Sequence, residues 1–235
     1  MSETKIKSIL INEMQNKVSN GLYYYSQINF AYNSNRIEGS RLSEEQTKEI
    51  FSNSSNNNLI IDDEVIETQN HFKLFDYILE IVDREINVEM ILEMHRILKS
   101  NTSEKMYAGK FKICENVIGK INSIETVVPS NVLKKVENLI YNYKMIDKVT
   151  IEDIIDFHYQ FEIVHPFNDG NGRIGRIIMF KECLKNNIIP FIIADENKLF
   201  YLRGLKNYKY DKMFLVDACK NAQDMYEQVC NILID

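Results

Sequence analysis

The sequence predicts an all-α fold with one small β-hairpin. Three observations carry this prediction. Apolar residues recur at helical spacing through most of the chain, and only eight glycines and three prolines interrupt its 235 residues. Residues 105–128 lose the helical period and are the candidate β element. Because 45% of the residues are hydrophobic and 26% are charged, the composition is that of an ordinary globular domain with a sizeable core.

Helices are expected in the first part of the chain wherever apolar residues return every three or four positions. Gly39 should end the second of them, since glycine adopts the left-handed conformation common at helix ends. Ser43 with Gln46 forms a capping-box pattern, and Asn87 is a further cap. The polar run 52–58 cannot bury surface and predicts a loop. The expected helices are 4–19, 22–35, a short one through Phe51, 63–83, and one from Asn87 through Leu98.

The second part of the chain contains the one expected β element. Residues 105–128 are rich in β-branched residues and predict a hairpin or flap, with Lys105, Lys110, Lys112 and Lys120 as its solvated rim. Ser130 is predicted to cap the next helix, and Thr150 with Asp153 forms a second capping box. Further helices are expected over 131–144, 151–164, 171–185, 196–206 and 211–232, with a short apolar segment at 188–194.

Bulk properties narrow the function classes. A net charge of −6 argues against duplex nucleic acid as the main partner. The four cysteines have no metal-ligand spacing, and Cys183, Cys219 and Cys230 fall in apolar helical patterns that favour core positions. No apolar run is long enough to cross a membrane, and the first residues lack a signal-peptide pattern. We therefore expect a cytoplasmic protein without a membrane partner.

Chemistry-bearing residues are concentrated in one stretch, His165 to Arg176, which reads HPFNDGNGRIGR. Three of the eight glycines fall inside it, and glycine lets backbone approach a ligand closely. A histidine moves protons near neutral pH, an aspartate binds hard cations, and arginine forks match phosphate oxygens. The stretch therefore predicts a phosphate site with a built-in base.

Local signals place this stretch between two helices. Pro166 should end the helix before it, because a residue preceding proline is driven out of the α region. Phe167 should anchor the loop in the core. Gly170 then opens the next helix, whose N-terminus presents unpaired N–H groups and a partial positive charge. Arg173 and Arg176, three apart on that helix, would add charge-assisted hydrogen bonds.

Two other motifs compete with this interpretation. Gly170, Gly172 and Gly175 match the dinucleotide-binding fingerprint, with Asp195 at the expected distance, but that fingerprint requires a buried strand before its first glycine. A helical pattern precedes it here. Glu162-x-x-His165 has the di-iron carboxylate spacing, but the sequence holds no second copy. The remaining histidines are interpreted as packing, structural or surface residues, namely His71, His95 and His158.

The stretch from His165 to Arg176 resembles the signature of the Fic family, H-P-F-x-[D/E]-G-N-G-R-x-x-R, at all nine specified positions. Weaker similarity extends over roughly residues 20–220, through 89–98, the flap at 105–129, His158, Tyr201 and Leu205. The resemblance implies a Fic-type helical bundle with a hairpin flap. It also implies transfer of AMP from ATP to a protein hydroxyl, with Mg²⁺.

The resemblance assigns roles residue by residue. His165 would deprotonate the target hydroxyl, and Asp169 would bind Mg²⁺ on the α- and β-phosphates. Gly170, Asn171 and Gly172 would form the anion hole, and Arg173 and Arg176 would hold the β- and γ-phosphates. The nucleotide-binding set is completed by Ile174, Gly175, Tyr201 and Leu202.

Three positions deserve comparison with family patterns. Gly172 stands where the related Doc-like kinases have lysine, which favours nucleotide transfer over phosphoryl transfer. Lys112 replaces a frequent arginine in the flap. Leu202 replaces a frequent second tyrosine beside the adenine. The resemblance therefore defines the phosphate contacts better than the adenine contacts.

A second motif lies upstream. Ser34 to Gly39, read SNRIEG, resembles the inhibitory motif of the same family, [S/T]-x-x-x-E-[G/N], with Ser34, Glu38 and Gly39 at its specified positions. The resemblance implies that Glu38 pairs with Arg176 and takes the fork that would grip the γ-phosphate. Couplings of this kind are about 1–3 kcal/mol, or roughly 5–150-fold. Residues 1–60 would then carry the inhibitory helices and 61–235 the catalytic core, in one compact unit.

These motifs predict a self-inhibited adenylyltransferase that modifies a Ser, Thr or Tyr hydroxyl of a protein, including its own. The target segment would dock along the 105–129 flap by strand addition. Two alternatives stay open: the same site could remove AMP, or the chain could be a nucleotide-sensing module of a toxin–antitoxin-like pair. A homodimer that buries the helix of Glu38 is compatible with the pattern.

Overall fold

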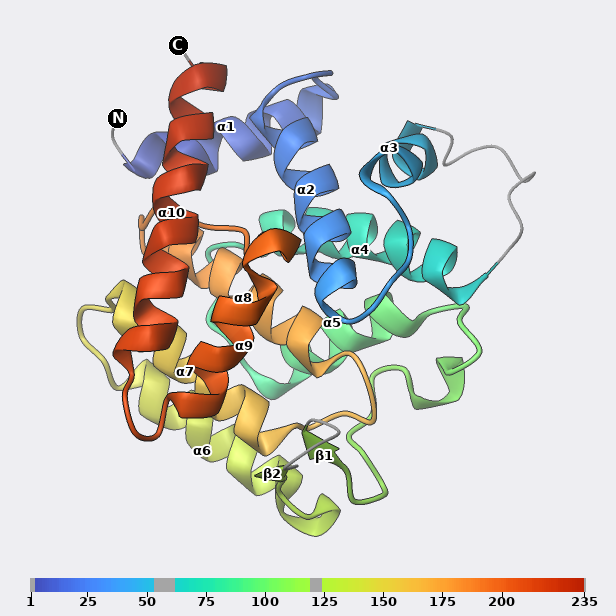
Figure 1. Ribbon diagram of the computed structural model, residues 1–235, viewed down its shortest axis with the longest axis vertical. Helices are drawn as coiled ribbons and strands as arrows, with labels where there is room; N and C mark the ends of the chain where they lie inside the picture. The colour runs from blue at the N-terminus through green and yellow to red at the C-terminus, as the bar shows by residue number, and fades with distance from the viewer. Residues whose placement is uncertain (1–2, 53–61, 119–123, 235) are drawn as a thin grey trace.

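A single buried helix, α8 (Asn171–Lys185), lies at the centre of the computed structural model (Figure 1). The structure describes residues 3–52, 62–118 and 124–234. Every residue of α8 from Asn171 to Leu184 is buried, including its arginines. A helix enclosed on all sides needs partners on all sides. Its neighbours come from both halves of the chain, namely α1, α2, α4, α5 and α7.

The described residues contain ten α-helices, which confirms the predicted all-α class. The helices before α8 are α1 (Glu3–Asn16), α2 (Leu22–Ile37), α3 (Glu44–Ser52), α4 (Asp63–Glu80), α5 (Val88–Lys99), α6 (Val132–Lys144) and α7 (Ile151–Val164). Those after it are α9 (Lys198–Asn207) and α10 (Met213–Ile234). Short 3-10 turns span Lys105–Tyr107, Pro129–Asn131 and Asp195–Asn197.

The predicted helix-start signals are present. The Ser43 N–H donates to Gln46 Oε1 at 2.8 Å, and the Gln46 N–H donates back to Ser43 Oγ at 3.2 Å. Thr150 and Asp153 form the same reciprocal pair at the start of α7. Asn87 accepts from the Met90 N–H at 2.8 Å. These local interactions fix where α3, α5 and α7 begin, as the sequence predicted.

Helix boundaries differ from the prediction by up to three residues, and two of these differences have a visible local cause. Ser130 does not cap α6, because Pro129 begins a 3-10 turn that contains Ser130, and the helix starts only at Val132. The helix predicted over 63–83 ends at Glu80, where Ile81 leaves the helical conformation and a turn leads to α5. The predicted loop 52–58 lies almost entirely outside the described residues, and so does Lys120.

The strand content of the predicted flap is small. β1 (Val117–Ile118) pairs antiparallel with β2 (Ile124–Glu125), Val117 facing Glu125. Residues 119–123 between them lie outside the described residues, so the hairpin connection stays a prediction. Before β1 the chain bonds to the glycine-rich stretch instead of to a strand, since the Lys112 N–H donates to the Pro166 carbonyl at 2.8 Å.

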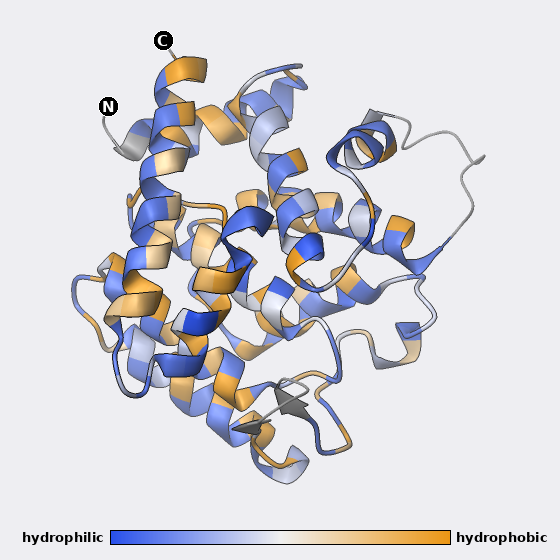
Figure 2. Ribbon diagram, viewed as in Figure 1, coloured by the Kyte–Doolittle hydropathy of each residue, from blue (hydrophilic) through white to orange (hydrophobic). Residues whose placement is uncertain are grey.

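Aromatic side chains tie α8 to its neighbours. The Phe180 ring lies 5.4 Å from Phe30 of α2, 5.3 Å from Phe75 of α4 and 5.8 Å from Tyr226 of α10, between centroids. Cys183, Cys219 and Cys230 are buried, as predicted. Helices around the centre alternate hydrophobic and hydrophilic residues along their length (Figure 2). No helix in the described part of the chain is long and apolar enough to cross a bilayer.

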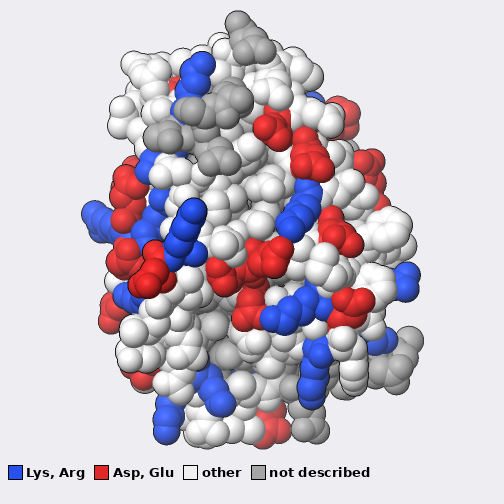
Figure 3. All heavy atoms as spheres, turned by 90° about the vertical axis from the view of Figure 1, so that its left-hand side faces the viewer, with Lys and Arg blue, Asp and Glu red and all other residues white. Residues whose placement is uncertain are grey.

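The surface charge is mixed rather than segregated. On the face shown in Figure 3, Lys and Arg side chains lie among Asp and Glu side chains. Such an arrangement favours local ion pairs, for example Lys220 of α10 with Glu152 of α7 at 2.9 Å. Exposed pairs of this kind contribute about 0–1 kcal/mol each, so the core carries the stability.

We predict that Phe180→Ala lowers the free energy of unfolding by about 3–5 kcal/mol, because the substitution removes a fully buried ring shared by four helices. Phe200→Ala is the matched control, since Phe200 is 66% exposed. Urea denaturation followed by circular dichroism measures both. A loss for Phe180→Ala no larger than that for Phe200→Ala would contradict the central place of α8.

Candidate active site

The loop between α7 and α8 is fixed by three of its own residues. His165 adopts the left-handed conformation, φ 48°, at the end of α7, directly before Pro166. Phe167 is fully buried, and its ring stacks on His95 with centroids 3.8 Å apart. Asn171 Oδ1 accepts from the Phe167 N–H at 2.8 Å, and its Nδ2 donates to the Phe167 carbonyl at 2.9 Å. The Asn171 side chain therefore closes the loop, while its backbone lies at the start of α8.

The start of α8 has the geometry expected of an anion site. Gly170 has φ +83°, a conformation that favours glycine, and a Cβ there would lie 3.1 Å from Leu98 Cδ2. No side chain caps the helix, so the backbone N–H groups of its first turn face the site. The helix dipole adds a favourable interaction of about 0.3–1 kcal/mol for an anion at this end.

His165 is held as a neutral imidazole. Its Nδ1 lies 3.3 Å from the Glu162 carbonyl oxygen, which commits that nitrogen and leaves Nε2 to act on a ligand. Burial lowers the pKa of His165 below its ordinary value, and the Lys112 charge acts in the same direction. A neutral imidazole is the form in which histidine can accept a proton.

Glu162 lies behind His165, without forming the metal site that its spacing suggested. Its carboxyl oxygens are 4.0 Å from Nδ1 of both His158 and His165. Burial, reinforced by Glu38, raises its pKa to about 8, so the group is protonated at neutral pH. Among the described residues, no group of three His, Cys, Asp or Glu side chains could hold a metal ion.

Asp169 is positioned by α5. The His95 Nδ1 accepts from the Gly109 N–H at 3.1 Å, so the ring carries its proton on Nε2 and donates it to the Asp169 carbonyl at 3.2 Å. Burial opposes ionisation of the Asp169 carboxyl, but Arg173 and Lys99 outweigh it and lower its pKa to about 2. The sequence interpretation of His95 as structural was right; its surface alternative was wrong, because the ring is buried.

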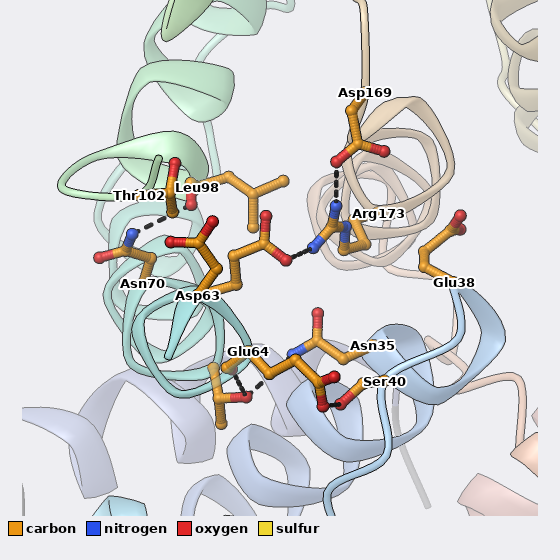
Figure 4. A network of polar contacts seen from close by, with 12 residues as sticks. Asn35, Glu38, Ser40, Asp63, Glu64, Asn70, Leu98, Thr102, Asp169 and Arg173 are labelled. Atoms are coloured by element: carbon orange, nitrogen blue, oxygen red, sulfur yellow. Dashed lines mark hydrogen bonds and ion pairs between the residues drawn. The ribbon is translucent and has the colours of Figure 1, made fainter. Parts of the chain in front are cut away.

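Asp169 belongs to a closed ring of four charged side chains, which Arg173, Glu67 and Lys99 complete. Arg173 donates Nη2 to Asp169 Oδ2 at 2.7 Å and Nη1 to Glu67 Oε2. Lys99 donates to Glu67 Oε1 at 2.6 Å and also to Asp169 Oδ2. Figure 4 shows the Arg173 fork meeting the Asp169 carboxylate at the start of α8. Charges of opposite sign alternate around the ring.

Glu67 and Lys99 are functional candidates that sequence reasoning missed. Each stands four residues from a buried histidine on its helix, Glu67 before His71 and Lys99 after His95. That spacing places both members of a pair on one helix face. The signal was present, but nothing in the sequence related α4 or α5 to Asp169.

Arg176 is gripped by the end of α2. Its Nε donates to Ser34 Oγ at 3.0 Å, and its Nη2 donates to the Ser34 carbonyl at 3.0 Å and to Glu38 Oε1 at 2.6 Å. The side chain of Arg176 is 4% exposed. Burial opposes ionisation of Glu38, but Arg176 and Arg173 outweigh it and lower its pKa. Arg176 thus binds Ser34 and Glu38, which lie 142 and 138 positions before it in the chain, and its ion pair with Glu38 is partly buried.

The Glu38 carboxylate also covers the start of α8. A Cβ added to Gly172 would overlap Glu38 Oε1 and lie 2.8 Å from Arg176 Nη1. Figure 4 shows Glu38 at the end of α2, beside the helix that carries Arg173. Glu38, Glu67, Asp169 and Arg173 line one cavity of about 220 Å³, together with Asn35, Gly39, Ser40 and Glu64. Gly39 itself follows α2 with φ +104°, the predicted helix stop.

The other predicted nucleotide contacts lie at different depths. Tyr201 is buried, and its hydroxyl is 2.6 Å from His158 Nε2. Leu202 is 41% exposed, beside the Tyr201 backbone. The Ile174 side chain lies in the hydrophobic core. A Cβ on Gly175 would lie 2.5 Å from His158 Nδ1, so this glycine permits close packing of α7 on α8.

One lysine of the predicted solvated rim is not solvated. Lys112 is 3% exposed, and its Nζ donates to Asn116 Oδ1 and Thr126 Oγ1, each at 2.6 Å. Asn116 in turn donates to the Phe167 carbonyl at 2.9 Å. Lys112 therefore serves as a buried donor to oxygens of the flap segment itself. The spacing of the lysines in the sequence did not reveal this role.

Comparison with known proteins relates part of this chain to a family. Residues 85–183 match the model of the Fic/DOC family. Over these residues the chain is similar to that family. A protein adenylyltransferase, fic-1 of Caenorhabditis briggsae, is 27% identical over 187 residues, covering 75% of this chain and 35% of the relative. A probable protein adenylyltransferase of Aquifex aeolicus is 34% identical over 97 residues, covering 41% of this chain and 29% of the relative.

The fold around the matched residues is also shared. A solved structure of a Fic domain containing signaling protein from Bacteroides thetaiotaomicron superposes with a TM-score of 0.77 at 18% identity, covering 99% of this chain and 96% of that one. This likeness concerns the fold alone. The chain spans about a third of the length of the curated relatives it matches.

We predict that the His165 imidazole titrates below the ordinary histidine pKa of about 6.5 in the folded protein. Burial penalises the charged form, so the ring stays neutral as the pH falls through 6.5. NMR titration of the ring carbons measures the midpoint, with the urea-unfolded chain as the reference. A His165 midpoint at or above the unfolded value would show that the base is not held neutral.

Proposed function

We propose that the chain is a self-inhibited protein adenylyltransferase, which transfers AMP from ATP to a Ser, Thr or Tyr hydroxyl of a protein. The observation that carries the proposal is the meeting of His165, Asp169, Arg173 and Arg176 at the start of α8, with Glu38 bound to Arg176. The similarity to adenylyltransferases supports the reaction class.

The site chemistry follows from this geometry. The target hydroxyl oxygen attacks the α-phosphorus of ATP, and His165 Nε2 accepts the hydroxyl proton. The bond from the α-phosphorus to its bridging oxygen breaks, and pyrophosphate leaves. Backbone N–H groups at the start of α8 stabilise the charge that develops on the phosphate oxygens. General-base catalysis of this kind contributes roughly 10²–10⁴-fold.

The donor set at Asp169 fits Mg²⁺ bound together with a nucleotide. Asp169 is ionised, and its side chain is 46% exposed, so one carboxylate reaches the cavity. Mg²⁺ is commonly bound by one or two carboxylates plus substrate phosphates, so a single protein ligand suffices. When bound, the cation would neutralise phosphate charge, while Asp169 fixes its place.

In the site without ligand, carboxylates of the chain neutralise the arginines, and this pairing accounts for the proposed inhibition. Arg176 is paired with Glu38, and Arg173 with Glu67 and Asp169. Phosphates must compete with these carboxylates for the arginine forks. Because Glu38 also covers the Gly172 backbone, a bound nucleotide cannot place its phosphates in line for attack while Glu38 is there.

We predict that Glu38→Gly raises transfer of labelled AMP from ATP to protein by roughly 5–150-fold, because Arg176 is freed for the γ-phosphate. Glu64→Gln is the matched control: Glu64 lines the same cavity but pairs with Arg41 instead of a site arginine. Radiolabel transfer, including self-modification, measures the rate.

Adding His165→Ala to Glu38→Gly should remove roughly 10²–10⁴-fold of that rate. Equal labelling by the wild type and Glu38→Gly, with the His165 variant inactive, would disprove the inhibitory role. Nucleotide binding by Glu38→Gly without any transfer would instead favour the nucleotide-sensing module.

Removal of AMP is a second candidate, favoured by the place of Glu38. Its carboxylate lies against Gly172, at the anion-binding end of α8, within reach of a water that attacks a protein-bound AMP. We predict that the wild type releases AMP from a modified target faster than Glu38→Gly does. Chromatographic detection of free AMP distinguishes the two directions, and equal release by both variants would exclude this role.

The target would dock along the 105–129 segment. Lys112 and Asn116 bond this segment to the Pro166 and Phe167 carbonyls, which places it beside His165. A peptide added to β1 or β2 would be recognised through its backbone more than its side chains. Identifying the target therefore requires mass spectrometry of a cell lysate that the Glu38→Gly variant has modified.

A further inference from the structure

Lys99 is the most completely bonded cation of the site. Its side chain is 4% exposed, and its Nζ contacts three carboxylates: Glu67 at 2.6 Å, Glu104 at 2.9 Å, and Asp169. An ammonium group has three N–H donors, so these contacts use all of them. The carboxylates come from α4, from the turn before Lys105 and from the loop before α8. Lys99 thus has one fixed position.

The Asp169 carboxylate is shared between two fixed cations. Its Oδ2 accepts from Lys99 Nζ and, at 2.7 Å, from Arg173 Nη2. Arg173 cannot withdraw without leaving Glu67, and Lys99 cannot withdraw without leaving Glu67 and Glu104. A divalent cation arriving at Asp169 alone would therefore meet two positive charges that cannot move away. Water that reaches Asp169, whose side chain is 46% exposed, weakens this repulsion without removing it.

A nucleotide reverses this balance. Its polyphosphate brings several negative charges to the same cavity, next to Arg173 and the start of α8. These charges offset the two protein cations and supply the further oxygen ligands that a hard cation needs. The cation and the nucleotide then stabilise each other's binding, and by linkage the coupling is equal in both directions.

We propose that Lys99 is a positioning residue that takes the place of the metal at Asp169 and makes cation binding there conditional on the nucleotide. The proposal rests on the proposed function for the location of the nucleotide. It requires no AMP transfer, so it can fail or hold independently of the reaction. A lysine with a purely structural role would change stability but not the affinity for free metal.

The test is Mn²⁺ binding to the purified chain, followed by electron paramagnetic resonance. The titration is run without nucleotide and with an ATP analogue carrying a methylene bridge between the α- and β-phosphorus. For the wild type we expect weak binding alone and at least ~10-fold tighter binding with the analogue. Lys99→Met should bind Mn²⁺ alone at least ~10-fold more tightly than the wild type, because one repelling charge is gone.

Three further variants make the result specific. Lys99→Arg keeps the charge and should behave as the wild type. Lys105→Met is the matched control, since Lys105 is exposed on the neighbouring turn. Asp169→Asn added to Lys99→Met should abolish the gained affinity. If Lys99→Met fails to fold, Lys99→Met with Glu67→Gln removes one charge of each sign from the ring and should show the same gain.

Two results would overturn the proposal. One is unchanged nucleotide-free Mn²⁺ affinity in folded Lys99→Met or in its charge-balanced double variant. The other is a gain that survives Asp169→Asn, which would place the metal elsewhere. Absence of AMP transfer by Glu38→Gly, with the Mn²⁺ results as expected, would refute the proposed reaction and leave the role of Lys99 intact.

Discussion

Burial of arginine at the start of the central helix is the constraint on which the rest of the structure depends. A buried guanidinium is stable only when carboxylates and carbonyls satisfy it. Arg176 obtains these partners from α2, and Arg173 obtains Glu67 from α4. The N-terminal helices must therefore pack on the part of the chain that matches the Fic/DOC family. The predicted division of the chain at residue 60 is based on its motifs. In the structure α2, which precedes that position, and α4, which follows it, both pack against α8.

The same constraint explains how one site could be both inhibited by its own carboxylates and preorganised to bind phosphates. In the proposed function, the arginines that hold phosphates must already be charged, oriented and partly dehydrated before a ligand arrives. Carboxylates within the chain keep them so, and each carboxylate occupies a position that a phosphate oxygen could take. Glu38 contacts Arg176 from the residue that follows α2, whereas Glu67 contacts Arg173 from within α4, one turn after its start.

Much of this could be predicted from the sequence, because it depends on local rules. Caps at Ser43, Asn87 and Thr150 fixed helix starts, and Pro166 with Gly170 bounded the loop. Resemblance to a family motif related Glu38 to Arg176. The partners Glu67, His95 and Lys99 could not be predicted, since they reach Asp169 only through the packing of α4 and α5 on α8. The buried state of Lys112 likewise depends on where the flap segment meets the loop.

The contrasting locations of Gly172 and Glu38 have a dynamic consequence. Gly172 belongs to a helix that is buried from Asn171 to Leu184, so displacing its backbone requires unfolding much of the core. Glu38 follows the last turn of α2, where Gly39 already leaves the helix and only a short stretch of backbone needs to fray. In the proposed function, the restraint by Glu38 can therefore open through a local fluctuation that leaves the anion site intact. The lifetime of the restraint is then set by a helix end, and the lifetime of the site by the whole core.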